Sequence, residues 1–262
     1  MANATTQTII MIHGFRGTHH GLSLIAENLH DYSVVVPDLP GFGEGEKLAD
    51  YSLDSYVAWL HQYIHDLHLS DRPILLGHSF GSIVTAAYAA HFPETISRLI
   101  LVNPIGAPAL EGPKRLLTNL AIFYYWLGTK LPKRLAEPWL QSQIVVMIMS
   151  TTMAKTKDKK LRGYIHDQHR QYFSRFHDAT SVSEGFKTSV SHNVSEFAGL
   201  VKTPTLLIAG EKDDITPLQK QQTLVTLFPN AKLEIIYGTG HLTHYEAPGQ
   251  IALLVQAFIN SV

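Results

Sequence analysis

The sequence predicts a doubly wound α/β fold in which a mostly parallel sheet of about six strands carries an inserted helical lid. Three observations support this prediction. Short apolar runs recur along the chain with helical patterns between them, as in alternating strands and helices. These runs are nearly continuous, which is typical of strands buried on both faces of a parallel sheet. One connection between strands is far longer than a crossover requires.

The expected strands follow from the apolar runs at residues 8–12, 33–36, 73–76, 98–102, 205–209 and 232–237. Connecting helices are expected from the amphipathic patterns at residues 22–29, 53–67, 81–91, 218–227 and 248–259. Open α/β sheets bind their ligands beyond the carboxyl ends of the strands. The residues that follow each strand are therefore the first candidates for a functional site.

The long connection lies between Val102 and Thr205, roughly 100 residues apart, whereas a crossover needs about a dozen. A loop of that length without secondary structure is uncommon. Helix formers and aromatic residues are frequent in it, notably at residues 116–126, 139–149 and 161–176. The sequence therefore predicts a helical lid over residues 104–203, inserted into a core formed by residues 1–103 and 204–262.

The composition suits one α/β domain with a sizeable core, since 45% of the 262 residues are hydrophobic and 16% are charged. The net charge of −1 gives no drive toward nucleic acid. The chain has no cysteine, which excludes disulfides, a thiol nucleophile and thiolate metal sites. No signal peptide or stable membrane insertion is expected, because the N-terminus lacks a basic segment and the apolar stretches are short. We therefore expect a cytoplasmic protein.

The charge is unevenly distributed along the chain. Residues 113–176 contain 12 Lys and Arg against 3 Asp and Glu, although the whole chain is nearly neutral. Such a segment can attract anionic substrates, an acyl carrier or a membrane surface. A set of solvated helix faces also explains the charges, and this simpler interpretation is favoured. The aromatic and Met residues of the lid either line an acyl pocket or, as we favour, pack in its core.

The most informative segment is Gly77-His78-Ser79-Phe80-Gly81, which lies between an expected strand and an expected helix. A serine on so sharp a turn has a strained backbone, and its neighbours two positions away pass close to it. Glycine fits those positions because it has no side chain to clash. The pattern indicates a nucleophile elbow that presents the Ser79 hydroxyl at the sheet edge.

A serine nucleophile needs a base and a carboxylate that orients it. Asp213 follows the fifth expected strand and His241 follows the sixth, in the chain order Ser, Asp, His. Asp214 is the alternative acid, although it also suits a cap of the next helix. His244 is the alternative base, and we expect it instead to make a lid or surface contact.

Backbone N–H groups that stabilise a negative oxygen are expected at Phe15, in a glycine-bearing turn after the first strand, and at Phe80, after the serine. His13 is expected to brace this turn, and His78 to pack beside the elbow. Arg16 either meets a substrate carboxylate at the mouth of the site or is an ordinary exposed arginine. The pair His19-His20 has no metal-ligand spacing and is interpreted as a solvated helix start.

Taken together, the chain resembles the α/β-hydrolase superfamily. The matching motifs are His13-Gly14, residues 38–43, residues 77–81, Gly210 with Asp213, and Gly240-His241. The resemblance implies that Asp213, three residues after the strand-end glycine, is the acid. Only about a dozen residues precede His13-Gly14, which implies a compact six-stranded version. Haloalkane dehalogenases and epoxide hydrolases carry Asp where this chain has Ser79, so those reactions are not expected.

These residues predict a serine hydrolase that cleaves carboxylic esters through an acyl-enzyme. Its partner is a small-molecule ester or acyl substrate, and the sequence predicts no cofactor and no metal. Relatives with the same triad hydrolyse carbon–carbon bonds or thioesters, and both remain alternatives. A receptor or scaffold with the hydrolase fold is the non-enzyme alternative. The sequence leaves the oligomeric state open.

Overall fold

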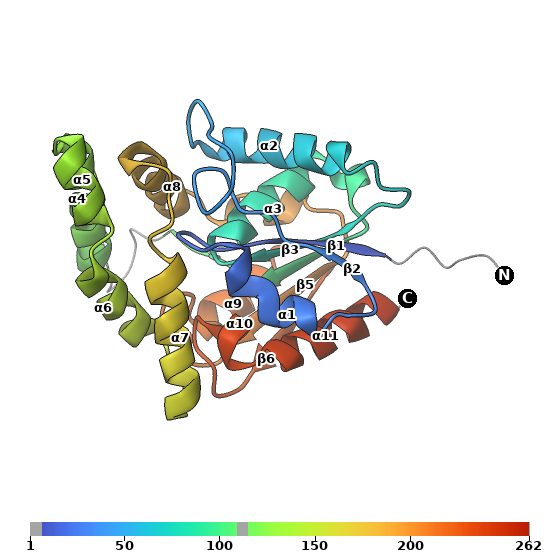
Figure 1. The fold of residues 1–262 in the computed structure, drawn as a ribbon. Helices are drawn as coiled ribbons and strands as arrows, with labels where there is room; N and C mark the ends of the chain where they lie inside the picture. The colour runs from blue at the N-terminus through green and yellow to red at the C-terminus, as the bar shows by residue number, and fades with distance from the viewer. Residues whose placement is uncertain (1–6, 109–114, 262) are drawn as a thin grey trace.

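The fold is known from a computed structural model that describes residues 7–108 and 115–261. Its centre is a parallel sheet with the strand order β2-β1-β3-β4-β5-β6 (Figure 1). The strands are β1 Thr8–Ile12, β2 Ser33–Val35, β3 Ile74–His78, β4 Arg98–Val102, β5 Thr205–Gly210 and β6 Ala231–Ile236. The predicted six-stranded, parallel α/β fold is confirmed, and each strand begins within one residue of its expected position.

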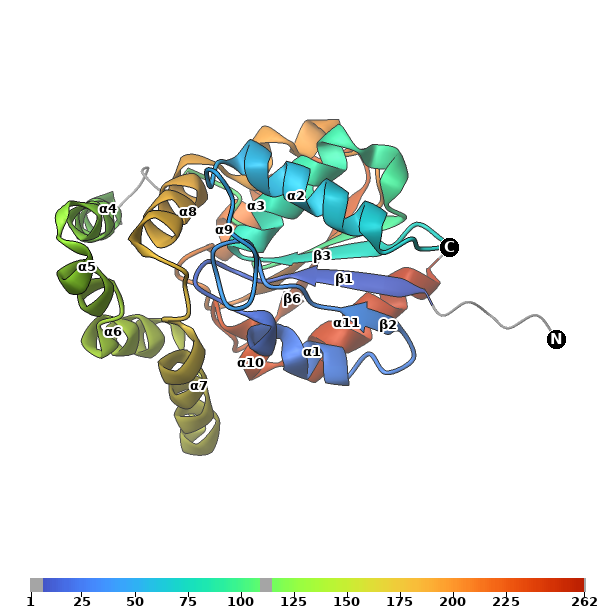
Figure 2. The same cartoon turned by 45° about the horizontal axis from the view of Figure 1, so that its top comes forward.

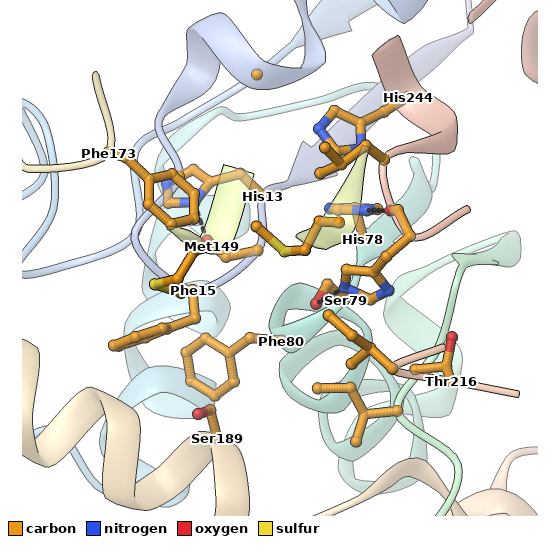
Figure 3. A pocket seen from close by; sticks show the side chains of 18 of the residues that line it. His13, Phe15, His78, Ser79, Phe80, Met149, Phe173, Ser189, Thr216 and His244 are labelled. Atoms are coloured by element: carbon orange, nitrogen blue, oxygen red, sulfur yellow. Dashed lines mark hydrogen bonds between the residues drawn. The ribbon is translucent and has the colours of Figure 1, made fainter. Parts of the chain in front are cut away.

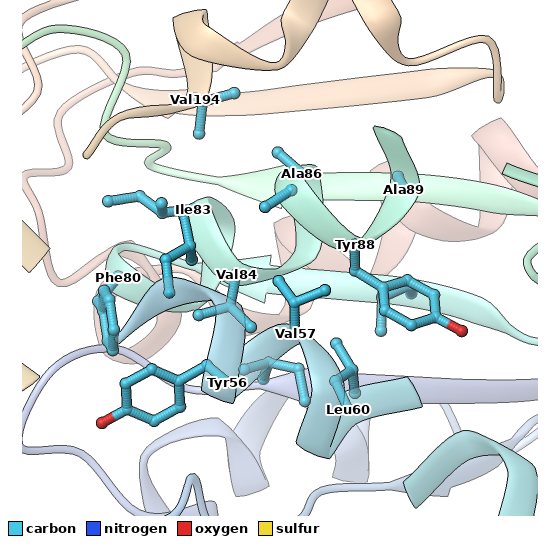
Figure 4. Close-up of a cluster of buried hydrophobic side chains, with 14 of the residues drawn as sticks. Tyr56, Val57, Leu60, Phe80, Ile83, Val84, Ala86, Tyr88, Ala89 and Val194 are labelled. Carbon is cyan, nitrogen blue, oxygen red and sulfur yellow. The ribbon is translucent and has the colours of Figure 1, made fainter. Parts of the chain in front are cut away.

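Helices cover both faces of the sheet (Figure 1). One face carries α2 Leu53–Asp66, α3 Phe80–His91 and α9 Leu218–Val225, and the other carries α1 Ser23–Glu27 and α11 Pro248–Asn260. Successive side chains of β1 point to opposite faces of the sheet. Ile10 belongs to a first cluster of buried side chains, on the face of α2 and α3, and Ile9 belongs to a second cluster, on the face of α1 and α11. Figure 4 shows the first cluster, in which Tyr56 of α2 packs against Phe80 at the start of α3.

The edge strands differ from the central ones. β1, β3, β4 and β5 are buried almost throughout, whereas exposed residues recur along β6. The prediction that the strands are buried on both faces is therefore confirmed for the four central strands. It is wrong for β6, an edge strand with a neighbour on one side only. The helix expected at residues 22–29 is present but shorter, as α1 Ser23–Glu27, and the 3-10 turn His19–Leu22 precedes it.

The long insertion between β4 and β5 is helical. It contains α4 Arg115–Lys130, α5 Lys133–Leu140, α6 Gln143–Met153, α7 Lys159–Tyr172 and α8 Ala179–Ser191, followed by the 3-10 turns Val194–Glu196 and Ala198–Leu200. We call α4 to α8 the cap. Both views place α4, α5 and α6 at the outer edge of the molecule, with α8 nearer the sheet (Figures 1 and 2). The division into a core and a lid domain at residues 104 and 203 stays a prediction.

The stretches rich in helix formers fall in α4 to α7. The stretch 139–149 spans the end of α5 and the start of α6. The helix α8 was not anticipated, because its Ser, Thr and Gly residues have modest helix propensity. A capping box between Asp178 and Ser181 begins it, and Val182 is fully buried. Within the described residues, no helix has the length and hydrophobicity to cross a membrane.

Candidate active site

Ser79 lies on the sharp turn between β3 and α3. Its backbone is strained, with φ of 52° and ψ of −119°. A side chain on Gly77 would lie 2.5 Å from the carbonyl oxygen of Gly81, and one on Gly81 would lie 2.6 Å from that of His13. The turn therefore requires glycine at both positions, as the sequence pattern indicates.

The structure brings Ser79, His241 and Asp213 together in one hydrogen-bonded chain. The Ser79 Oγ lies 2.8 Å from the Nε2 of His241, and the Nδ1 of His241 lies 2.8 Å from the Oδ2 of Asp213. Asp213 follows β5 and His241 follows β6, so both side chains reach Ser79 along the carboxyl edge of the sheet. A hydroxyl, an imidazole and a carboxylate at these distances can pass a proton away from the hydroxyl.

Asp213 is buried and its carboxylate is fully engaged. Its Oδ1 accepts hydrogen bonds from the backbone N–H groups of Ile215 at 2.7 Å and Thr216 at 2.9 Å. Its Oδ2 accepts one from the Thr216 hydroxyl at 2.5 Å. Burial alone raises the pKa of Asp213, but the adjacent His241 ring and these hydrogen bonds outweigh it and lower the pKa to about 2. The side chain is therefore an anion at neutral pH.

Asp214 and His244, the alternative acid and base, make other contacts within the same pocket. Asp214 forms an ion pair with Lys155 of the cap, and no side chain caps α9. His244 is buried on the short helix α10 Thr243–Glu246, where its ring lies 4.1 Å from that of His78. Of the two contacts expected for His244, the surface contact is wrong, because α10 folds the side chain inward against the elbow. There it interacts electrostatically with His169 of the cap helix α7.

Asn103 holds the loops of the site together, although the sequence analysis did not single it out. This fully buried residue follows β4. Its side-chain amide donates to the carbonyl oxygens of His241 at 2.8 Å and Gly240 at 3.0 Å, and its side-chain oxygen accepts from the Gly210 N–H at 2.9 Å. The available signal was its position, a polar residue at a strand end. Asn103 fixes the ends of β4 and β5 to the loop that carries His241.

The two amides expected to bind an oxyanion belong to Phe80, which follows Ser79 in the elbow, and to Phe15, in the turn after β1. Gly77 of β3 is level with Ile12 of β1, so the turn after β1 runs beside the Ser79 turn. Phe80 is the first residue of α3, where N–H groups have no partner within the helix. In the described residues, neither amide donates a hydrogen bond to another group of the protein. Both are free to bind an oxygen of a ligand.

His13 braces the turn that carries Phe15, as expected. Its Nδ1 donates to the carbonyl oxygen of Gly14 at 2.9 Å, and its Nε2 accepts from the N–H of Leu39 at 2.8 Å. Burial lowers the pKa of His13. The ring is therefore neutral, and it ties the turn after β1 to the segment after β2.

Arg16 contradicts both interpretations of the sequence, because it neither lines the pocket nor reaches solvent. Only 1% of the residue is exposed. Its Nε donates to the carbonyl oxygen of Phe173 at 2.8 Å, and its Nη2 donates to that of Leu140 at 2.9 Å. Its Nη1 lies 3.2 Å from the Tyr125 hydroxyl, and the guanidinium lies against the ring of Phe176. Arg16 thus joins the Phe15 turn to α4, α5 and the end of α7.

A second attachment of the cap to the core lies at the loop that carries His241. Glu246 of α10 accepts hydrogen bonds from the backbone N–H groups of Lys155 at 2.6 Å and Thr156 at 2.7 Å, which follow α6. Its other oxygen accepts from the N–H of Gly240 at 2.6 Å, beside His241. Arg16 and Glu246 therefore fasten the cap at the two turns that flank Ser79.

A pocket of about 720 Å³ lies between the sheet edge and the cap. Its wall includes the side chains of Phe15, Phe80, Met149 and Phe173, which lie on one side of Ser79 in Figure 3. Most of the remaining lining is also apolar, for example Ile215. A pocket of this volume and character accommodates a hydrophobic chain of moderate length.

Several pocket histidines are buried and uncharged. His78 packs beside the elbow as expected, and burial together with the neighbouring His241 lowers its pKa to about 3. Burial likewise places the pKa of His244 well below its ordinary value and lowers that of His169 in α7 to about 4. By contrast, His19 contacts Asp38 at 3.0 Å, and His20 stacks on Tyr172 of the cap. The expected helix start at His19-His20 is confirmed, because the 3-10 turn His19–Leu22 begins there, but both side chains are partly buried rather than fully solvated.

The parallel sheet, the strained serine turn and the helical insertion are the architecture of α/β hydrolases. The chain belongs to the α/β-hydrolase family, because the family model described as "alpha/beta hydrolase fold" matches residues 7–248.

Curated relatives match nearly the whole chain. Lipase 3 of Moraxella sp. (strain TA144) is 26% identical over 265 residues, which cover 98% of this chain and 78% of the relative. Monoacylglycerol lipase ABHD6 of Bos taurus is 28% identical over 272 residues, which cover 97% of this chain and 76% of the relative. These relatives support an ester-hydrolysing enzyme of the lipase or esterase kind.

Solved structures share the fold at lower sequence identity. A thermophilic esterase from Thermogutta terrifontis aligns with a TM-score of 0.80 and 20% identity, covering 97% of this chain and 90% of that chain. A bromoperoxidase from Bacillus anthracis aligns with a TM-score of 0.78 and 18% identity, covering 98% and 93%. The different names of these two proteins illustrate that one fold supports several reactions, so the reaction has to be argued from the site.

Proposed function

We propose that this protein is a serine hydrolase that cleaves carboxylic esters through an acyl-enzyme intermediate. The observation that carries the proposal is the chain of two 2.8 Å hydrogen bonds from Ser79 through His241 to Asp213. Ser79, at one end of this series of hydrogen bonds, lies on a strained turn and lines the apolar pocket. Nucleophile, base and orienting carboxylate are the three groups that acyl transfer by a serine requires.

In the proposed mechanism, the Ser79 Oγ attacks the ester carbonyl while the Nε2 of His241 takes its proton. Asp213 holds the imidazole in the required tautomer and stabilises the imidazolium. The N–H groups of Phe15 and Phe80 bind the developing oxyanion, and each such donor typically lowers the barrier by roughly 3 kcal/mol. His241 then gives the proton to the leaving alcohol. Water, deprotonated by His241, attacks the acyl-enzyme and releases the acid.

The proposed substrate is the ester of a hydrophobic acid, such as a monoacylglycerol. The apolar pocket favours an aliphatic acyl chain, since each buried methylene contributes about 0.8 kcal/mol. The names of the curated relatives, lipases and monoacylglycerol lipases, point the same way. Residues 104–203 act as the lid in this proposal, since Met149 of α6 and Phe173 after α7 form part of the pocket wall.

A substrate panel tests the proposal. Purified protein is assayed on p-nitrophenyl butyrate and octanoate, on a monoacylglycerol, on an acyl thioester and on a β-diketone. The ester substrates are expected to turn over fastest, and Ser79→Ala is expected to lower kcat by at least about 10⁴-fold. Ser70→Ala, at an exposed position, is the matched control and keeps full activity.

The other outcomes separate the alternatives. Preferred turnover of the β-diketone or the thioester replaces the esterase by a carbon–carbon hydrolase or a thioesterase with the same catalytic residues. Folded protein without turnover on any member of the panel contradicts an enzymatic role and favours a receptor or scaffold.

A further inference from the structure

Three consecutive helices of the cap expose large apolar side chains to solvent. We call these side chains the outer cap face: Leu120, Phe123 and Trp126 of α4, Leu135 and Trp139 of α5, and Ile144 and Ile148 of α6. Every one of them is at least 40% exposed, and Ile144 reaches 74%. The three helices form the outermost layer of the molecule in both views (Figures 1 and 2). So many exposed apolar side chains close together indicate an interaction surface.

The spacing of these residues shows that each helix has a dedicated outer side. Leu120, Phe123 and Trp126 are three residues apart and share one side of α4, where the rings of Phe123 and Trp126 stack at 5.8 Å. Ile144 and Ile148 are four residues apart on α6. The inner sides of the same helices are accounted for, because Ala121 and Met149 line the pocket. Packing within the chain therefore explains the inner sides. The outer side chains stay largely exposed, although Trp139 also contacts the ring and the carbonyl oxygen of Tyr124 on α4.

Positive charge accompanies the outer cap face. Lys130, Lys133 and Arg134 are exposed around the turn between α4 and α5, and Glu137 is the only acidic residue from 115 to 153. None of the three cations pairs with a carboxylate in the described part of the chain. The Nζ of Lys130 lies 5.9 Å from the ring of Trp126. Cationic and apolar groups are thus side by side, as in helices that lie in the interface of an anionic membrane.

We propose that the outer cap face is a docking surface for membranes that contain anionic phospholipids. The apolar side chains enter the acyl boundary, and the three cations contact the phosphate groups of the lipids. Self-association through the same face is less favourable. A two-fold interface brings the same patch of both copies together, so Lys130, Lys133 and Arg134 of one copy would meet those of the other.

The docking surface adds a partner to the proposed hydrolase and places its pocket directly behind the membrane contact. Ala121 and Met149 reach the pocket from the helices whose other side carries the face. Only this last point rests on the proposed function, because docking itself needs no catalysis.

Vesicle sedimentation tests the proposal. Ser79→Ala protein, which leaves the lipid intact, is mixed with phosphatidylcholine vesicles and with vesicles in which about a third of the lipid is phosphatidylglycerol. Binding is expected to the anionic vesicles and to weaken with added salt. The triple variant Lys130→Gln, Lys133→Gln, Arg134→Gln is expected to bind about 100-fold more weakly, since each cation near the surface is worth about a factor of 5.

A second triple variant removes the apolar part of the face. Phe123→Ser, Ile144→Ser and Ile148→Ser together are expected to weaken binding by at least about 10-fold. Matched controls are Leu253→Ser on α11 and Lys232→Gln on β6, which change exposed side chains of the same kinds away from the cap. Both controls are expected to bind as the parent does.

Three results overturn the proposal: no binding to anionic vesicles, triple variants that both bind as tightly as the parent, or lipid-independent dimerisation that the apolar variant abolishes. The triple changes are also made with Ser79 intact, and turnover of soluble p-nitrophenyl butyrate then shows that the site is folded. Lack of turnover by the unmodified protein would defeat the proposed function instead, and vesicle binding would stand unaffected.

Discussion

The carboxyl edge of the sheet and the cap are held together in different ways. At the sheet edge, Asp213 and His241 are buried, Thr216 donates to the Asp213 carboxylate at 2.9 Å, and Asn103 donates to the His241 carbonyl oxygen at 2.8 Å. The cap is built from helices with an exposed outer side, and polar contacts of Arg16 and Glu246 fasten it to the core. In the proposed mechanism, the hydrogen-bonded sheet edge therefore supplies the chemistry, and the cap controls access to the pocket.

The largest effect on activity is expected from a change at the sheet edge alone. Asp213→Asn removes the anion that holds the His241 tautomer, and kcat on a p-nitrophenyl ester is expected to fall by up to about 10⁴-fold. Asp214→Asn is the matched control, since Asp214 pairs with Lys155 of the cap, and its kcat is expected to stay within about threefold of the parent. Similar losses in both variants would contradict the assignment of Asp213 as the acid.

Acid is expected to destabilise both regions together. His78, His169 and His244 have pKa values lowered by burial, so below about pH 6.5 the unfolded chain binds protons that the native protein excludes. Stability therefore falls between about pH 6.5 and pH 4, by up to about 1.4 kcal/mol per pH unit for each ring. The depressed pKa of Asp213 acts in a lower window, where stability is lost as the pH falls below 3.8 toward about 2.

Urea unfolding at pH 7, 6 and 5 measures this loss. His244→Phe, which keeps a ring of similar size, is expected to reduce the slope by about one proton. The control His65→Gln changes an exposed ring and is expected to leave the slope unchanged. A free energy of unfolding that is flat from pH 7 to pH 5 would show that the rings are protonated in the folded state.

An effect of intermediate size is expected from a change that removes the attachment of the cap to the sheet edge. Arg16→Met leaves the carbonyl oxygens of Phe173 and Leu140 buried without a donor, and is expected to lower the free energy of unfolding by about 2–4 kcal/mol. Because the Phe15 turn loses its attachment to the cap, kcat is expected to fall as well. Denaturant titration and steady-state kinetics measure both, with exposed Arg170→Met as the control. Unchanged stability and kcat would mean that the cap is held by packing alone.

The smallest expected effect refines the role of the cap in substrate choice. Met149→Trp enlarges a side chain in the pocket wall, so the ratio of kcat/KM for octanoate over butyrate esters is expected to fall about 10-fold. Met147→Trp lies on the outer side of the same helix and should leave this ratio unchanged. Equal ratios in the two variants would place the acyl chain away from α6.

The same contrast explains what the sequence could predict. The strands, the glycines of the Ser79 turn and the positions of Asp213 and His241 depend on local patterns and on the shared edge of a parallel sheet. The burial of Arg16 depends on partners more than 100 residues away, such as Tyr125, and no local pattern encodes it. The helix α8 was missed for a related reason, because its weak intrinsic preference is offset by its cap and its packing. The cytoplasmic location remains a prediction from the sequence alone.

The central claim is that Ser79 is a nucleophile activated by His241. Intact and peptide mass spectrometry after labelling with a fluorophosphonate probe tests it most directly. The account predicts one adduct per chain, located on Ser79, absent in Ser79→Ala and formed much more slowly in His241→Gln. Folded protein that forms no adduct at Ser79, or that labels equally fast without His241, would contradict it.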